Sequence, residues 1–322
     1  MGVTDHGLIV GVDGGGSKTH AVALTLDGEL VGRGDGPGSS PHWIGVEASI
    51  DIVDAAVRAA LGGGTAAQAN LYLSGLDLEA EVTAYTAALV QMPWAGPRTV
   101  VANDLWALLR AGTESPDAVA VICGTGINAV GVRADGATVR FAALGPISGD
   151  WGGGSGLGEE ALWHAARDED GRGPATLLRD AVLRGMGVSS IARLTEDLHL
   201  GRRALTELAV LSPAVFDAAR QGDAVAGALV DRQAAEVVAF ARAALTRLEL
   251  LDREVPVVLG GGIIRAGDER LMRGISEGLA ADAPHARIVI VSAPPIVGAG
   301  LLALESAGAS PAALDRARAA LS

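Results

Sequence analysis

Cysteine and lysine are nearly absent from this sequence of 322 residues, which has one of each, Cys123 and Lys18. A single cysteine excludes an intramolecular disulfide, and it excludes a zinc or iron–sulfur site built only from the cysteines of one chain. Aromatic residues make up only 3% of the sequence, so the core must consist of alanine, valine, leucine and isoleucine. Every other basic residue is arginine, and the single lysine therefore needs an explanation.

Long apolar runs and an excess of positive charge are also missing. The net charge is −13, and because an acidic surface repels nucleic acids and anionic membranes, we expect neither as a partner. No stretch reaches the roughly 18 apolar residues of a membrane span, and the N-terminus lacks the pattern of a signal peptide. The sequence therefore predicts a cytoplasmic, globular α/β protein, and its length indicates about two domains.

The first third of the chain alternates short apolar strands with helices. The Asp27-Gly28 pair is a strong hairpin signal between two of the strands. Apolar residues at helical spacing predict the helices. The predicted strands cover about 7–13, 20–27, 29–34, 69–76 and 98–104, and the predicted helices cover 45–61, 79–92 and 105–112.

The same plan begins again near residue 118. A strand runs into glycines, two strands surround Asp135-Gly136, and Ala- and Leu-rich helices follow from about 161 to 248, then the strands "VPVVLGGG" and "RIVIVS". Such a repeat predicts two related α/β domains facing a cleft, at 1–115 and 116–322, separated by the turn-rich "GTESPD". We expect a last helix, at about 296–307, to pack back on the first domain.

Three glycine clusters each follow an apolar strand. They lie at 14–16, 124–126 and 260–262. Glycine allows backbone N–H groups to turn toward a phosphate and lets the backbone approach it closely. One cluster alone is as consistent with a plain turn, but three clusters in equivalent places favour a nucleotide site.

Two common nucleotide motifs fail on their context. Gly11 and Gly16 have the spacing of a P-loop, but Ser17 separates Gly16 from Lys18, and a strand follows where a P-loop opens a helix. Gly124, Gly126 and Ala129 fit a dinucleotide fingerprint, yet the residues after them are predicted to form a hairpin. The pyrophosphate would then have no helix N-terminus to bind.

A phosphate-binding strand–loop–strand, present twice, is the pattern of the superfamily of sugar kinases, heat-shock chaperone ATPases and actin. "GVDGGGSKTHAVALTLDG" resembles its first phosphate loop, "VICGTGINAVGV" the second and "VVLGGGIIRAGDERL" the adenosine loop. Within it, "SSPHWIG", "VANDLWALLRAG", "CGTGIN" and "GPISGDWGGGSGLGEEAL" resemble the BadF/BadG/BcrA/BcrD ATPase family, in particular its N-acetylglucosamine kinase branch. The resemblance runs from about residue 8 to 306 and implies two ribonuclease H-like, actin-like ATPase domains.

The resemblance also implies the cofactors and their residues. ATP would lie on the glycine loops with Mg²⁺ held, mostly through water, by Asp13; the alternative for Asp13 is an Asx turn. A compact ammonium on Lys18 would approach the β- and γ-phosphates where a guanidinium does not fit. The residues expected around the nucleotide are Gly14, Gly15, Gly16, Ser17, Lys18, Thr19, Gly124, Thr125, Gly126, Gly260, Gly261 and Gly262.

The catalytic base implied by the resemblance is Asp104, which would accept the proton of the attacking sugar hydroxyl. The alternative is a helix N-cap at Asn103 or Asp104. The residues expected to contact the sugar are His42, Trp43, Asn103, Asn128 and Asp150, the last in a glycine-rich segment read as a loop. The alternatives are a Trp that packs the loop onto its own domain and solvated or turn-forming polar residues.

Two departures from the family pattern leave the sugar open. Relatives usually have Asn before His-Trp, where this chain has Pro41, and they often have Glu where it has Trp151. We expect a homodimeric kinase acting on the 6-hydroxyl of an amino sugar, N-acetylglucosamine first, with glucosamine and N-acetylmuramate as alternatives. An ATPase that drives electrons into a dehydratase or reductase would need more cysteines, and a non-catalytic sugar sensor would not need both Asp13 and Asp104.

Overall fold

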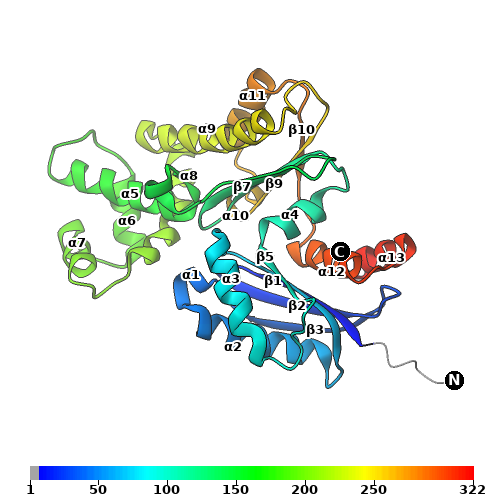
Figure 1. The fold of residues 1–322 in the computed structure, drawn as a ribbon. Coiled ribbons are helices and arrows are strands. Elements are labelled where there is room, and N and C mark those ends of the chain that lie inside the picture. The colour runs from blue at the N-terminus through cyan, green and yellow to red at the C-terminus, as the bar shows by residue number, and fades with distance from the viewer. Residues whose placement is uncertain (1–6) are drawn as a thin grey trace. The chain divides into compact units, whose positions relative to one another are not determined.

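The computed structural model describes residues 7–322, which form two compact units (Figure 1). Unit 1 contains the chain up to Ala120 together with Val291–Ser322, and unit 2 contains Val121–Ile290. The division after Ala120 comes slightly later than the expected one at 115. The C-terminal segment belongs to unit 1, so the first unit is built from both ends of the chain.

Unit 1 is built on a five-stranded sheet with the order β3-β2-β1-β4-β5. Strands β1, β2 and β3 are antiparallel, and the Asp27-Gly28 turn follows β2, with Gly28 at φ +82°. Strands β4 and β5 run parallel to β1, so the carboxyl ends of these three strands share one edge. The bounds are β1 (Leu8–Gly14), β2 (Lys18–Leu24), β3 (Leu30–Pro37), β4 (Ala66–Leu73) and β5 (Val100–Asn103).

Helices cover both faces of this sheet, because buried side chains alternate along its strands. Val10 and Val12 lie in the core under α2 and α3, while Ile9 lies in the core under α4, α12 and α13. The helices are α1 (Pro41–Ile44), α2 (Val46–Leu61), α3 (Glu79–Ala88), α4 (Leu105–Gly112), α12 (Pro295–Ser306) and α13 (Pro311–Leu321), with the 3₁₀ helix η1 (Leu89–Gln91). Helix α13, capped by the Ser310 side chain, was not predicted.

Unit 2 repeats the plan of unit 1. Its sheet has the order β10-β9-β6-β7-β8, so the first strand of each sheet is central, with its second and third strands on one side and the fourth and fifth on the other. This confirms the predicted pair of related α/β domains. The strands are β6 (Ala118–Cys123), β7 (Ile127–Val132), β8 (Thr138–Arg140), β9 (Pro256–Gly260) and β10 (Arg287–Ile290).

Unit 2 contains most of the helices of the described residues. They are η2 (Gly145–Ser148), α5 (Gly153–Glu169), α6 (Leu178–Met186), α7 (Ile191–His199), η3 (Leu205–Leu211), α8 (Ser212–Arg220), α9 (Ala224–Arg247), α10 (Gly262–Arg265) and α11 (Glu269–Asp282). Among the described residues, no helix is both long and apolar enough to cross a membrane.

Candidate functional site

Acidic side chains gather at the carboxyl edge of the unit 1 sheet. Asp13 lies near the end of β1 and Asp104 directly follows β5. Burial, together with the negative charges of Asp13 and Asp77, raises the pKa of the Asp104 carboxyl to about 8. Asp104 is therefore close to both acids. Perturbed acids of this kind are typical of functional sites.

Asn103 differs from its predicted role as a sugar contact. Its side chain is only 2% exposed, and both ends of the amide are used within unit 1. Oδ1 accepts from the Leu105 N–H at 3.0 Å, and Nδ2 donates to Asp77 Oδ1 at 2.9 Å. The Asn103 amide thus caps the start of α4 and holds Asp77. The Asp104 side chain makes no capping hydrogen bond to this helix.

The first glycine loop forms the predicted strand–loop–strand. The Gly15 N–H donates to the Lys18 carbonyl at 2.8 Å, which closes the turn between β1 and β2. Ser17 and Lys18 are exposed, but Thr19 is fully buried. Side chains alternate along a strand, so Lys18 and Thr19 point to opposite faces. The expectation that Thr19 faces a phosphate is therefore corrected, and Lys18 and Ser17 remain candidates.

His42 and Trp43 lie on α1, a helix of one turn that begins at the buried Pro41. Trp43 is 50% exposed and its ring meets the His42 imidazole edge-on, with centroids 5.0 Å apart. A tryptophan packed into its own domain would be buried. The half-exposed ring is available to cover the face of a sugar, and its contact with the sugar stays a prediction.

The second and third glycine loops adjoin each other in unit 2. Gly124–Gly126 connects β6 to β7, which confirms a strand–loop–strand, while Gly260–Gly262 leads from β9 into α10. Gly261 has φ +96°, and a Cβ there would lie 2.2 Å from the Cys123 carbonyl oxygen. Only glycine permits this approach. The predicted second phosphate loop and adenosine loop therefore form one continuous surface.

Helix α5 begins directly on the second loop. The N–H groups of Gly154 and Ser155 donate to the carbonyls of Gly124 and Thr125 at 2.8 and 2.9 Å. Gly153, at φ +70°, donates its N–H to Gln233 Oε1 at 2.8 Å. The glycine-rich segment read as a loop is therefore the start of a helix, and its glycines serve close packing rather than flexibility.

Asp150 lies just before this helix, where its N–H donates to the Gly145 carbonyl and its carboxylate accepts from the Ser148 hydroxyl. The Asn128 Oδ1 is 2.7 Å from the Ala129 N–H. Trp151, the departure from the family pattern, turns back onto its own unit. The Arg232 guanidinium lies 3.9 Å from the centre of its ring, and its Nε1 donates to Glu160 at 3.2 Å.

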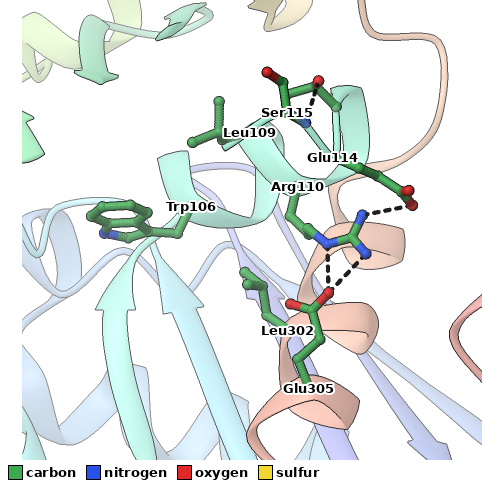
Figure 2. Close-up of a pocket in the computed structure, with 8 residues that line it drawn as sticks. Trp106, Leu109, Arg110, Glu114, Ser115, Leu302 and Glu305 are labelled. Carbon is green, nitrogen blue, oxygen red and sulfur yellow. Dashed lines mark hydrogen bonds and ion pairs between the residues drawn. The ribbon is translucent and has the colours of Figure 1, made fainter. Parts of the chain in front are cut away.

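One cavity of unit 1, of about 300 Å³, lies away from these acids, between α4 and α12 (Figure 2). Arg110 crosses it, with Nε 2.8 Å from Glu305 Oε1 and Nη1 3.2 Å from Glu114 Oε1. The Arg110 side chain is only 14% exposed. Arg110 therefore acts as a structural clamp between α4, α12 and the segment that leaves unit 1.

We expect Arg110→Ala to lower the free energy of unfolding by about 1–2 kcal/mol, because it removes the pairing of Glu305 on α12 with α4 and one of the two arginines that contact Glu114. Arg58→Ala is the control, since Arg58 is exposed and pairs with Asp54 on one face of α2; it should change stability by at most about 0.5 kcal/mol. Urea unfolding of both variants measures the difference, and equal midpoints would contradict the clamp.

Sequence reasoning missed three residues near the site. Asp77 lies between the predicted strand 69–76 and the predicted helix 79–92, Ser155 lies in the segment predicted to be a loop, and Gln233 lies within the predicted helices. The Ser155 Oγ and Gln233 Nε2 are buried polar atoms without a hydrogen-bond partner among the described residues. No local sequence signal distinguishes them, because their positions depend on contacts between distant segments.

Comparison with known proteins identifies the class. Residues 10–303 match the BadF/BadG/BcrA/BcrD ATPase family. The chain therefore belongs to the BadF/BadG/BcrA/BcrD ATPase family, as the resemblance predicted. Its two sheets have the actin-like fold of structural neighbours such as a ROK family glucokinase from Streptomyces griseus, at 19% identity and a TM-score of 0.55, with 93% of this chain and 99% of that chain covered.

Individual relatives are similar over nearly their whole length. The chain is 27% identical to an N-acetyl-D-glucosamine kinase of Dictyostelium discoideum, covering 93% of this chain and 98% of the relative. It is 27% identical to an N-acetylmuramic acid/N-acetylglucosamine kinase of Clostridium acetobutylicum, covering 80% and 85%. A solved structure from Chromobacterium violaceum, provisionally assigned as an N-acetylglucosamine kinase, has 26% identity and a TM-score of 0.73, covering 92% and 99%.

Proposed function

We propose that this protein is an ATP-dependent kinase that transfers the γ-phosphate to the 6-hydroxyl of an amino sugar, with N-acetylglucosamine as the first candidate. The observation that carries the proposal is Asp104, a carboxylate of raised pKa at the sheet edge where β1 presents Asp13. The names of the two kinase relatives, which both include N-acetylglucosamine, support this choice of substrate.

Asp104 is the proposed catalytic base. Phosphoryl transfer depends on positioning and charge neutralisation, with one carboxylate to orient the nucleophile and accept its proton. A raised pKa suits this task, because a base that holds its proton more tightly accepts it more readily from a hydroxyl. The sugar O6 would attack the γ-phosphorus as its proton passes to an Asp104 oxygen, and ADP would leave.

Lys18, Ser17 and the glycine loops would bind the triphosphate. Lys18 is exposed on the first hairpin, where its ammonium is free of the core. Gly124–Gly126 and Gly260–Gly262 would receive the nucleotide on unit 2. The fixed carbonyl-to-helix hydrogen bonds of the second loop keep that loop in one conformation before ATP arrives.

Asp13 would hold Mg²⁺. Within residues 7–322, no group of three or more His, Cys, Asp or Glu side chains is arranged to hold a metal ion by itself. A single carboxylate such as Asp13 fits magnesium, which commonly keeps several waters beside one or two carboxylates and the substrate phosphates. When bound, the ion would neutralise charge on the phosphates, and Asp13 would orient it through water.

The alternative of an electron-transfer ATPase is disfavoured. Cys123 is fully buried in β6, and burial raises the pKa of its thiol to about 12. A cysteine of that kind cannot ligate a cluster at the surface. N-acetylmuramate stays as the second candidate substrate, because the name of one relative includes it.

The test is ATP consumption with N-acetylglucosamine, N-acetylmuramate, glucosamine and glucose, each with Mg²⁺. We expect an amino sugar to stimulate turnover far above the rate with no sugar. Turnover that is independent of every sugar would reject the kinase, and an anaerobic iron assay on the same sample would then test the electron-transfer alternative.

We expect Lys18→Ala to raise the KM for ATP by about tenfold or more, because a charge-assisted contact with phosphate is lost. Lys18→Arg should recover only part of the affinity, since the planar guanidinium does not replace a compact ammonium in a tight loop. Steady-state kinetics at varied ATP measures both. An arginine variant equal to the wild type would remove the special role of lysine, while the loop assignment would stand.

A further inference from the structure

A buried chain of hydroxyl groups runs beneath the first loop. Tyr85 Oη lies 2.9 Å from Ser49 Oγ, and Ser49 Oγ lies 2.5 Å from the carbonyl oxygen of Ser39. The Ser39 hydroxyl lies 2.7 Å from Thr19 Oγ1, which is also 2.7 Å from the Pro37 carbonyl oxygen. Tyr85, Ser49, Ser39 and Thr19 are all fully buried. Such networks are costly unless every member is satisfied.

The two carbonyl oxygens of this chain, those of Pro37 and Ser39, indicate which hydroxyls donate. A carbonyl only accepts and a hydroxyl has one proton. Thr19 Oγ1 is therefore the donor at its end of the chain, with the Pro37 carbonyl oxygen and Ser39 Oγ as its two acceptors. By the same reasoning Ser49 donates to the Ser39 carbonyl, and Tyr85 must donate to Ser49. The Tyr85 hydroxyl thus supplies the proton that Ser49 Oγ accepts while Ser49 donates to the Ser39 carbonyl.

Ser39 is the point where the first loop meets the segment that carries His42 and Trp43. The Ser39 N–H donates to the Gly15 carbonyl at 3.1 Å. The preceding residue touches the same loop, because a Cβ on Gly38 would lie 2.2 Å from the Gly16 carbonyl oxygen. Helix α1 begins two residues after Ser39 and has a single turn, so its position depends on this anchor.

We propose that Tyr85 and Ser49 are positioning residues, which act through Ser39 to hold the His42–Trp43 segment at a fixed place relative to the first phosphate loop. This rests on the proposed function in one respect, namely that the segment contacts the sugar. The first phosphate loop and the His42–Trp43 segment then keep one fixed arrangement. The network thereby orients the sugar hydroxyl toward the γ-phosphate, although it contacts neither the sugar nor ATP.

The chain contains a matched control, because it has only two tyrosines, Tyr72 and Tyr85. Tyr72 is also buried and its hydroxyl accepts from Asn70 Nδ2 at 3.0 Å. Asn70 in turn reaches the Ser306 hydroxyl of α12, on the opposite face of the sheet. Burial raises the pKa of both tyrosines to about 12, so both are neutral hydrogen-bonding groups.

Tyr85→Phe should raise the KM for the sugar by roughly threefold to tenfold, the equivalent of one hydrogen bond, and leave the KM for ATP within about twofold. Ser49→Ala should have a larger effect, because it leaves both the Tyr85 hydroxyl and the Ser39 carbonyl without this partner. Tyr72→Phe should lower the melting temperature by a similar amount but leave the KM for the sugar unchanged. Equal changes in the sugar KM of both tyrosine variants would overturn the proposal.

Hydrogen exchange tests the anchor without depending on catalysis. The amides of residues 38–45 should exchange at least about threefold faster in Tyr85→Phe than in Tyr72→Phe, since the anchoring bond opens more often. Equal exchange in the two variants would reject the positioning role even in an active kinase. If the wild type phosphorylates no sugar while exchange differs as expected, the kinase proposal fails and the anchor stands.

Discussion

Asp104→Asn should abolish most sugar phosphorylation while making the protein without ligands more stable. The variant keeps the size of the side chain but removes the oxygen that accepts the proton of the attacking hydroxyl. Loss of a general base costs about 10²- to 10⁴-fold in kcat. Because Asn103, not Asp104, supplies the side-chain cap at the start of α4, the helix should be unaffected. Initial rates at saturating ATP and sugar measure the loss.

The gain in stability follows from the pKa of the Asp104 carboxyl, which burial and two neighbouring acids raise from 3.8 to about 8. Between these two pH values the folded protein holds a proton that the unfolded chain has lost, so stability falls as pH rises through this window. Asparagine does not titrate, so its burial carries no such pH-dependent cost in stability. At pH 7–8 without Mg²⁺, the variant should be more stable than the wild type by on the order of 2–4 kcal/mol.

The two profiles should approach each other as the pH falls toward 4, because the carboxyl of the unfolded chain becomes protonated around its ordinary pKa of 3.8. Asp51→Asn is the control, since Asp51 is exposed on α2, and it should change neither activity nor the pH profile. Thermal unfolding in EDTA from pH 4 to pH 8 is the measurement. A variant that is inactive but no more stable at pH 8 would contradict the assigned burial of the Asp104 charge.

Gly298→Ala should lower the free energy of unfolding by about 3 kcal/mol or more, although alanine favours helices. Gly298 lies in α12 where this helix crosses α4, and a Cβ there would lie 1.8 Å from the Ala107 carbonyl oxygen. The Ala107 backbone cannot move aside as a flexible side chain can. Helices α12 and α4 must therefore separate, and they lose packing contacts with the sheet. This outweighs the gain of about 1 kcal/mol in helix propensity.

Gly96→Ala is the control for this substitution, because among residues 7–322, apart from the chain neighbours of Gly96, no atom lies within 4 Å of a Cβ at that position. It should change stability by at most about 0.5 kcal/mol. Urea unfolding of both variants decides the matter. A Gly298→Ala protein as stable as the wild type would contradict the close crossing of α12 and α4. That crossing helps to fix the helix that begins after Asp104.

Much of the fold was predictable because its signals are local. Apolar runs bounded by glycine predict the strands, and Asp27-Gly28 predicts a hairpin. The repeated order of strands and helices predicts two related domains. Helix α13 was missed although Ser310 and Pro311 are ordinary signals for the start of a helix. The return of the C-terminal segment to unit 1 was expected only for a single helix.

Several predictions for the site differ from the structure, and each difference has a physical reason. Alternation along a strand would have separated exposed Lys18 from buried Thr19. Asn103 was assigned to the sugar by resemblance, but the cap of α4 and Asp77 use both ends of its amide. The glycines at 152–154 were read as a loop, because their reason, close approach to Gly124–Gly126 and Gln233, lies far away in the sequence.

The most direct test of the proposed kinase is to identify its product. Incubation with ATP, Mg²⁺ and an equal mixture of N-acetylglucosamine, N-acetylmuramate, glucosamine and glucose, followed by mass spectrometry and phosphorus NMR, shows which sugar gains a phosphoryl group and where. The proposed function predicts one amino sugar phosphorylated at O6 by the wild type and at most about a hundredth as much by Asp104→Asn. Release of ADP without any phosphorylated sugar, or full product from the variant, would contradict it.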